Sequence, residues 1–352
     1  MNIAPRKIKL SILDQSIVRK SGNATQAINE TIEVARLADR LGYTRFWVSE
    51  HHNSVMIAGS TPELLMVKLA DETNRIRIGS GGIMLPNHSA LKVAENFRML
   101  ETLFPGRIDL GMGRAPGTDR FTASLLNPSN TFSEESYLQQ LAHLQAFFKD
   151  EAGSQYGPVL AVPQSATIPE QWILSSSGGS SAIAARFGLG LAVAKFINGF
   201  AGPDVVDVYR KQFQPSSSFP EPHALLAIQV LCADTDEKAR ALRKMADYVL
   251  LQFEKGHFEP IGAYEEIKDY KFSVQELERI RINSGRVISG TPDKVSEQLS
   301  RLADDFGLDE IIVSCMAFSH EDRVRSFELL AEAFELKGYP SSAVGRMLSV
   351  NS

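Results

Sequence analysis

Short apolar runs alternate with amphipathic segments along most of the chain, and this alternation is the feature that most constrains the fold. Continuous apolar runs of this kind are typical of parallel strands that helices cover on both faces. Helical periodicity fills the intervals, for example over residues 24–42, where Gly42 is expected to cap the helix C-terminus. We expect strands at residues 7–14, 45–51, 76–85, 107–114, 171–177, 188–196, 223–234 and 308–316.

The number of these strand–helix units indicates the architecture. Eight units in one chain predict an α/β protein folded as a (β/α)8 TIM barrel, with a doubly wound open sheet as the alternative. Residues 252–286 break the alternation and are predicted to form a partly helical insertion between strands seven and eight. Because no long low-complexity linker divides the sequence, residues 1–352 are expected to be a single domain.

Composition and charge argue against several classes of partner. The net charge is −5, and there is no basic stripe with interleaved aromatic residues, so nucleic acid is not expected to bind. No apolar run reaches the roughly 18 residues that a membrane helix needs, and the N-terminus lacks the apolar core of a signal peptide. Cys232 and Cys315 lie in apolar stretches and are expected to be buried free thiols, which fits a cytoplasmic location.

Polar residues and glycines gather where four consecutive strands end. The C-terminal ends of barrel strands meet at one mouth, where catalytic residues of this fold lie. Such an accumulation at successive strand ends therefore predicts one shared site. The segments are "EHH" at 50–52, "GSGG" at 79–82, "GMGRAPG" at 111–117 and "SSSGGSS" at 175–181.

The adjacent histidines His51 and His52 are the first candidates for chemistry. Neighbouring side chains on a strand point to opposite faces, so the pair is poorly placed to hold one metal ion, and no metal site is expected. A histidine at the mouth can act as an acid, a base or a hydrogen-bond donor near neutral pH, with Glu50 orienting it or pairing with a cation. The alternative is a strand-end histidine with a structural role alone.

A phosphate site is predicted from the ends of strands four and five. Ser175, Ser176, Ser177 and Gly178 stand at a strand-to-helix junction, where backbone N–H groups attract anions. Arg114 ends the preceding strand, and its guanidinium would complete a clamp for phosphate.

The same residues also have simpler explanations. The serines and glycines can be an ordinary helix cap, "GSGG" can be a strand bulge, and Arg114 can form a salt bridge with Asp119 or Asp109. Residues 111–117 fit the dinucleotide fingerprint G-x-G-x-x-G poorly, because the last glycine is one position late. The residues leave open whether a phosphorylated cofactor or a phosphorylated substrate binds.

Three longer segments resemble a known family. "GYTRFWVSEHHN", "RIRIGSGGIMLPNHSALKVAENFRMLETLFPGRIDLGMGRAPGTD" and "AARFGLGLAVAKFI" resemble the bacterial luciferase-like, flavin-dependent monooxygenases. The resemblance runs from residue 7 to about residue 336, is strongest over 35–120, and keeps the order of the motifs. It is closer to the single-gene luciferase-like oxidoreductases than to the light-emitting subunits.

The resemblance implies a reaction and a set of partners. FMN would bind at the barrel mouth as FMNH2, supplied by a separate flavin reductase, and would react with O2. The C4a-(hydro)peroxyflavin formed would oxygenate a small organic substrate. Family members commonly form homodimers through the helices after strands two and three, here residues 61–74 and 90–104.

The resemblance also assigns roles to residues of this chain. His51 matches the catalytic histidine, and Glu50 is a supporting residue of the cofactor site. Gly81 and Gly82 match a place beneath the flavin ring where the family often has a cis peptide bond that does not precede proline. Arg114, Ser176 and Ser177 match the family's phosphate-binding positions, and Ser175 and Gly178 of the same strand-to-helix junction are expected to complete the site.

Three departures from the family affect these expectations. Ser176 stands where luciferase has an acidic residue in its phosphate loop, which should favour phosphate by removing a like charge. Gly113 stands where luciferase has a reactive cysteine, which argues against light emission. Lys195 stands where an aromatic residue approaches the flavin, with Phe196 next to it. Within the insertion, a lid over an apolar substrate and a packed surface segment are both open. The candidate lid residues are Phe253, His257, Phe258, Tyr264 and Tyr270.

Two other functions remain open for the same barrel. One is a deazaflavin-dependent dehydrogenase, which transfers hydride and does not require O2. The other is a flavin-binding protein without turnover.

Overall fold

The computed structural model describes residues 7–129, 131–155, 157–260 and 262–338. Within them, eight parallel strands form a closed barrel, because β8 pairs with β9 and β1 pairs with β11. Closure confirms the predicted TIM barrel and excludes the open sheet. The expected single domain also includes residues 1–6 and 339–352, which lie outside the described part. The barrel strands are β1 (Lys9–Asp14), β2 (Arg45–Val48), β3 (Arg77–Met84), β4 (Ile108–Gly113), β7 (Glu170–Ser175), β8 (Gly190–Ala194), β9 (Ala224–Cys232) and β11 (Glu310–Ser314).

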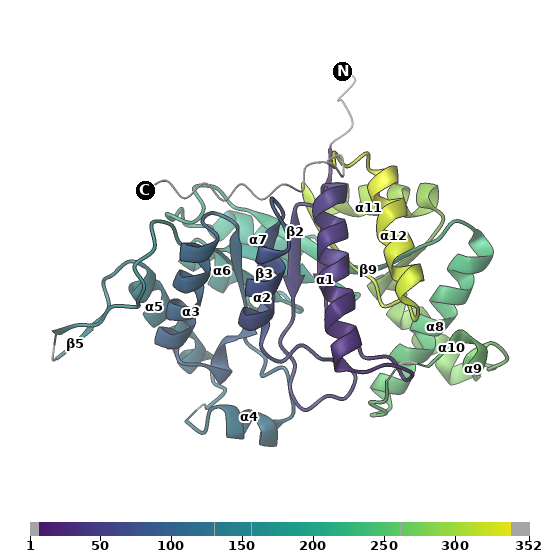
Figure 1. Cartoon of the computed structure of the whole chain (residues 1–352), viewed down its shortest axis with the longest axis horizontal. Helices are drawn as coiled ribbons and strands as arrows, with labels where there is room; N and C mark the ends of the chain where they lie inside the picture. Colours follow the sequence, from purple (N-terminus) through teal and green to yellow (C-terminus); the bar gives the residue numbers. More distant parts are fainter. Residues whose placement is uncertain (1–6, 130, 156, 261, 339–352) are drawn as a thin grey trace.

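Helices surround the barrel and bury their apolar faces against the outward side chains of the strands (Figure 1). Gly42 ends α1 with a φ of 89°, as the sequence predicts for a left-handed C-cap. No helix in the described ranges is long and apolar enough to cross a membrane. The helices are α1 (Ala24–Leu41), α2 (Pro62–Asp71), α3 (Ala90–Leu103), α5 (Glu134–Phe148), α6 (Ser181–Phe187), α7 (Asp204–Gln212), α8 (Asp236–Glu254), α11 (Pro292–Phe306) and α12 (His320–Ala333).

The predicted insertion lies between β9 and β11 and reaches the mouth. Ile267 and Tyr264 of α9 (Tyr264–Ile267) pack with Ile17 and Met56, which belong to the loops after β1 and β2. Figure 1 shows α9 and α10 at the same end of the barrel as α4. The remaining short helices are α4 (Arg120–Leu126), α10 (Val274–Asn283), and the 3-10 turns η1 (Leu85–Asn87) and η2 (Ser284–Arg286).

Three short strands were not predicted from the sequence. Strand β10 (Val287–Gly290) pairs in parallel with the C-terminal half of β9, immediately after the insertion. Strands β5 (Gly153–Ser154) and β6 (Gly157–Pro158) form a small antiparallel sheet. Runs of two to four residues carry too little periodicity to be separated from loops.

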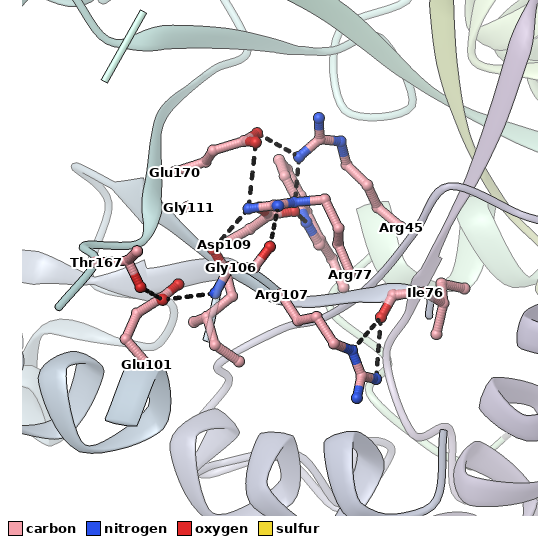
Figure 2. Close-up of polar contacts among 12 residues, drawn as sticks. Arg45, Ile76, Arg77, Glu101, Gly106, Arg107, Asp109, Gly111, Thr167 and Glu170 are labelled. Atoms are coloured by element: carbon pink, nitrogen blue, oxygen red, sulfur yellow. Dashed lines mark hydrogen bonds and ion pairs between the residues drawn. The ribbon is translucent and has the colours of Figure 1, made fainter. Parts of the chain in front are cut away.

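A buried ion cluster fills the end of the barrel where the strands begin (Figure 2). The Arg45 guanidinium lies 2.8 Å from Asp109 Oδ2, 2.8 Å from Glu170 Oε2 and 2.9 Å from Glu310 Oε1. Arg77 Nη2 lies 2.7 Å from the other oxygen of Asp109. Because these residues come from β2, β3, β4, β7 and β11, the cluster ties five strands together.

Opposite charges in this cluster compensate for the cost of burial. Burial alone would raise the pKa of the Asp109 carboxyl, but the charges of Arg45 and Arg77 lower it below its ordinary value. The Trp47 indole N–H also donates to Asp109 over 2.9 Å. Removing one member leaves the others buried and unpaired, which costs more than losing an exposed pair.

The packing changes along the barrel axis. Above the ions, Trp47 and Trp172 meet edge to face with their ring centroids 5.7 Å apart, and Leu13 packs against them. Nearer the strand ends, the alternation of the strands turns small residues inward. The inward positions near the mouth include the small residues Gly81, Gly113, Ala194, Ala227 and Ser314, and also the larger Leu174 and Gln229. Large side chains therefore fill the lower barrel, whereas small and larger residues together line the mouth.

We expect Arg45→Met to lower the free energy of unfolding by about 3–5 kcal/mol, because it leaves buried carboxylates unpaired. The matched control is Arg36→Met, which breaks an exposed pair with Glu72 and should cost less than about 1 kcal/mol. Urea unfolding at pH 7 measures both. Equal losses for the two variants would contradict the role given to the cluster.

Candidate active site at the barrel mouth

Glu50 organises the polar groups at the ends of β2 and β3. Its side chain is fully buried and accepts hydrogen bonds from four donors. The His52 and His88 Nε2 atoms lie 2.8 and 2.9 Å away, and the Met84 backbone N–H donates over 2.8 Å. The Asn87 side chain adds a longer contact of 3.3 Å. One carboxylate therefore joins the end of β2 to the end of β3 and to η1.

These contacts decide the charge of the carboxylate. Burial raises the pKa of Glu50, but hydrogen bonds from His52 and His88 outweigh it, and the pKa falls to about 2. Burial lowers the pKa of His88, and the hydrogen bond to Glu50 reverses this, so the net pKa is raised. Glu50 is thus ionised at neutral pH. The sequence did not identify His88 as a site residue. The only sequence signal for it was its position just after the expected strand at residues 76–85.

The two adjacent histidines have different surroundings, but the predicted strand alternation does not explain this, because β2 ends at Val48 and both residues lie beyond it. His52 binds Glu50, whereas the His51 backbone N–H donates to the Gly59 carbonyl over 2.9 Å. Burial lowers the pKa of His51, with the backbone of Gly117 and the charge of Glu50 opposing part of this effect. His51 is therefore a half-buried, neutral imidazole near pH 7. The sequence predicts that Glu50 orients a histidine. Glu50 forms hydrogen bonds with His52 and His88, so the prediction applies to these two residues.

The ends of β2 and β4 also meet. Thr118 Oγ1 donates to the His52 carbonyl over 3.1 Å, and Asn53 Nδ2 donates to Asp119 Oδ2 over 3.1 Å. Asn87 Nδ2 donates to the Pro116 carbonyl over 2.8 Å. The structure thus brings together three of the four strand ends that the sequence predicts to share a site.

Gly81 and Gly82 lie where β3 leaves its regular pairing with β4. The register shifts between Gly81 and Ile83, and the Gly81–Gly82 peptide bond is cis. A Cβ on Gly82 would lie 2.6 Å from the Gly111 carbonyl oxygen, so any side chain there would displace the backbone of the neighbouring strand. A strand bulge and a cis peptide bond were separate interpretations of the sequence. In the structure both occur at Gly81 and Gly82.

Arg114 is paired with a residue that the sequence did not indicate. Its Nη1 lies 2.5 Å from Glu134 Oε2 at the start of α5, and both side chains are exposed. The expected alternatives are wrong for reasons of position. Asp109 belongs to the ion cluster at the opposite end of β4, and Asp119 caps α4 through the Thr122 backbone N–H.

The serine-rich loop follows β7, the strand next to β4. Ser175 is buried and its hydroxyl accepts from the Gly178 backbone N–H over 3.2 Å, while Ser177 is exposed. A Cβ on Gly179 would meet no heavy atom within 4 Å, so the loop has open space beside it. Within the described residues, α6 begins without a side-chain cap, and its first backbone N–H, that of Ser181, donates to the Gly178 carbonyl over 3.0 Å.

The aromatic residue near the end of strand six is Phe196. Phe196 packs against the cluster of Trp47 and Trp172 inside the barrel. Lys195 Nζ instead donates to the Gly199 and Ala201 carbonyls over 2.7 and 2.8 Å. Although Lys195 stands where the family has an aromatic residue, Phe196 therefore still places an aromatic ring toward the barrel interior.

The candidate lid residues of the insertion fall into two groups. Phe253 and Phe258 are exposed and meet edge to face at 5.0 Å. Tyr264 is packed against the loops after β1 and β2, Tyr270 contacts other aromatic rings, and His257 bonds Gln252. The first pair remains a candidate cover for apolar substrate, while the others hold the insertion together.

No group of His, Cys, Asp or Glu residues that could hold a metal ion is found in the ranges that the structure describes. His52 and His88 form hydrogen bonds with Glu50 instead.

Comparison with known proteins identifies the family. Residues 8–310 match the family described as luciferase-like monooxygenase. The chain is 44% identical over 330 residues to the protein YwcH of Bacillus subtilis, covering 93% of this chain and 99% of that one. It is 35% identical over 336 residues to the N-acetyl-S-alkylcysteine monooxygenase of the same organism, covering 93% and 98%. The chain therefore belongs to the luciferase-like monooxygenase family.

Solved structures agree with this assignment. The crystal structure of apo-MsnO8 has a TM-score of 0.89 at 36% identity, covering 94% of this chain and 100% of that one. Two more distant structures share the fold. One is the oxygenating constituent of 3,6-diketocamphane monooxygenase in complex with FMN, at TM-score 0.68 and 18% identity, covering 93% and 97%. The other is an F420-dependent secondary alcohol dehydrogenase, at TM-score 0.65 and 13% identity, covering 93% and 99%.

We expect Glu50→Gln to lower the free energy of unfolding at pH 7 by roughly 3 kcal/mol, from the difference between a folded pKa of about 2 and the ordinary 4.5. A carboxyl with a lowered pKa stabilises the fold above pH 4.5, and this contribution is lost as the pH falls toward 2. Urea unfolding between pH 7 and 3 measures it.

The control is Glu95→Gln, which removes a partly exposed pair with Lys92 and should cost less than about 1 kcal/mol. The role given to Glu50 is wrong if Glu50→Gln and wild type lose stability in parallel below pH 4.5.

Proposed function

We propose that this chain is a flavin-dependent monooxygenase that uses reduced FMN and O2, through a C4a-(hydro)peroxyflavin, to oxygenate a small organic substrate. The observation that carries the proposal is a neutral, half-buried His51 beside a barrel mouth where several inward residues, among them Gly81, Gly113 and Ala194, are small. Membership of the luciferase-like monooxygenase family supports the oxygenation chemistry.

The residues at the mouth suit such a cofactor. Gly81 and Gly82 are proposed to face the ring, because glycines allow a flat ligand to approach the backbone closely. Glu50 would fix their position through the Met84 N–H. The cofactor phosphate is assigned to Arg114, Ser175, Ser176, Ser177 and Gly178, next to the open space at Gly179. When bound, reduced FMN would be the group that reacts with O2.

His51 is assigned the catalytic role. Because burial lowers its pKa, the imidazole stays neutral at pH 7 and carries one N–H donor and one acceptor nitrogen. Such a group can hold a proton at a reacting oxygen or remove one from a substrate. Below the lowered pKa the ring becomes cationic, so activity that needs the neutral form is lost on the acid side.

Deazaflavin chemistry is the second candidate. The observation in its favour is the shared fold with an F420-dependent dehydrogenase. Titration with reduced FMN and with reduced F420 under argon separates the two proposals. We expect binding of FMN, and selective binding of F420 would reverse the assignment. A flavin-binding protein without turnover would bind FMN and leave its rate of reoxidation unchanged.

We expect His51→Ala to bind reduced FMN within about threefold of wild type but to return it to oxidised FMN, with release of hydrogen peroxide, about 10- to 100-fold faster. The loss of the imidazole removes a hydrogen bond from the oxygen side of the cofactor. Stopped-flow absorbance and a peroxide assay measure this. The exposed His143→Ala variant is the control and should match wild type. Unchanged reoxidation in His51→Ala would make His51 structural.

Partners and location complete the proposal. We propose a separate flavin reductase as the source of reduced FMN and one barrel domain over residues 1–352. Cys232 and Cys315 are both buried and unpaired, which supports a reducing cytoplasmic location. A homodimer is proposed through α2 and α3, where Leu64 is 72% exposed and Met99 is 47% exposed.

We expect the double variant Leu64→Glu/Met99→Glu to weaken dimerisation at least about 100-fold, because it places charges in an apolar contact. Light scattering after size-exclusion chromatography measures the mass. Leu277→Glu, on the exposed face of α10, is the matched control and should remain dimeric. A dimeric double variant, or a monomeric wild type, would contradict this interface.

A further inference from the structure

We propose that Glu134 is a built-in competitor for the phosphate clamp: it shares Arg114 with the phosphate of the ligand and sets how strongly the site prefers a phosphorylated flavin over an unphosphorylated one. This inference rests on the proposed function, because it takes Arg114 as a phosphate ligand. It adds a specificity-determining residue on α5 that neither the sequence motifs nor the family resemblance indicated.

The contact between the two residues is short and direct. Arg114 follows the last residue of β4, and its Nη1 lies 2.5 Å from Glu134 Oε2. A charge-assisted hydrogen bond of this length uses one of the donors that a phosphate would need. Since β4 pairs in parallel with β7, Arg114 and the loop that begins at Ser175 follow neighbouring strands at the same end of the barrel. Glu134 and a phosphate at that loop would thus compete for one cation.

Arg114 and Glu134 are both exposed, and this makes it possible for a phosphate to replace Glu134 at Arg114. Arg114 is 40% exposed and Glu134 is 61% exposed, so water can solvate either group when the pair opens. Exposed ion pairs contribute little to stability, in contrast to the buried pairs of Arg45. A dianionic phosphate carries more charge than one carboxylate and offers several acceptor oxygens, so it can replace Glu134 at the guanidinium.

The backbone of Glu134 lies in a capped helix, while its side chain is exposed to solvent. Glu134 is the first residue of α5, and Ser133 caps this helix by accepting from the Ser136 N–H over 3.1 Å. One turn further, Tyr137 and Leu141 are buried in the core. The helix therefore keeps the carboxylate beside Arg114 whichever partner the guanidinium binds, and its negative charge also repels an incoming phosphate.

The neighbouring residue provides a matched control. Glu135 lies in the same first turn of α5, is exposed, and changes the net charge by the same amount when replaced by glutamine. No ion pair between Glu135 and Arg114 is recorded among the described residues. Any difference between Glu134→Gln and Glu135→Gln therefore reports the contact with Arg114 and excludes a general change in surface charge.

The test compares the dissociation constants of reduced FMN and reduced riboflavin, measured by titration under argon with the full chain. We expect Glu134→Gln to bind FMN about three- to tenfold more tightly than wild type, with riboflavin unchanged. Glu135→Gln should change neither. Equal behaviour of the two glutamine variants, or equal tightening of both ligands, would overturn the proposal.

A double-mutant cycle with Arg114→Gln locates the effect. In the Arg114→Gln background, Glu134→Gln should no longer tighten FMN binding, because the competition needs the guanidinium. A retained effect would contradict competition at Arg114. Failure of the proposed function gives a different pattern: wild type would then bind FMN and riboflavin equally, or bind neither, whatever stands at residue 134. Because both substitutions are on the surface, circular dichroism should be unchanged.

Discussion

The ion cluster around Arg45 is the interaction on which the rest of the barrel depends. One guanidinium joins carboxylates from three other strands, and Arg77 adds a second cation beside Asp109. With the lower barrel filled by these ions and by the Trp47–Trp172 layer, the fold does not need large side chains at the mouth. The glycines and alanines at the strand ends are therefore compatible with a stable barrel, and they leave room for a ligand at the mouth.

Another buried carboxylate, that of Glu50, fixes the other end of the barrel. Glu50 joins the ends of β2 and β3 through His52 and the Met84 N–H, and His88 adds a contact from beyond η1. The adjacent His51, in the segment after β2, is neutral and half-buried. The structural contact with Glu50 and the proposed catalytic role thus fall to adjacent residues. Arg114 of the proposed phosphate clamp, by contrast, is exposed and pairs with Glu134.

The barrel itself was predictable, because its strands are continuous apolar runs and eight of them require closure or a wide open sheet. The insertion after β9 was predictable as a break in this rhythm. Contacts between distant residues were not: His88 lies 38 positions from Glu50, and Glu134 lies 20 positions from Arg114. The Arg45 cluster was missed because charged residues at a strand start resemble loop residues. Strand β10 was missed because four residues carry no clear period.

The central claim is that this mouth holds reduced flavin while it reacts with O2. The most direct measurement mixes the full chain, loaded with one equivalent of reduced FMN under argon, with oxygenated buffer in a stopped-flow spectrophotometer. The account predicts two phases, with a flavin–oxygen adduct that persists before oxidised FMN appears. A single phase at the rate of free reduced FMN would contradict it.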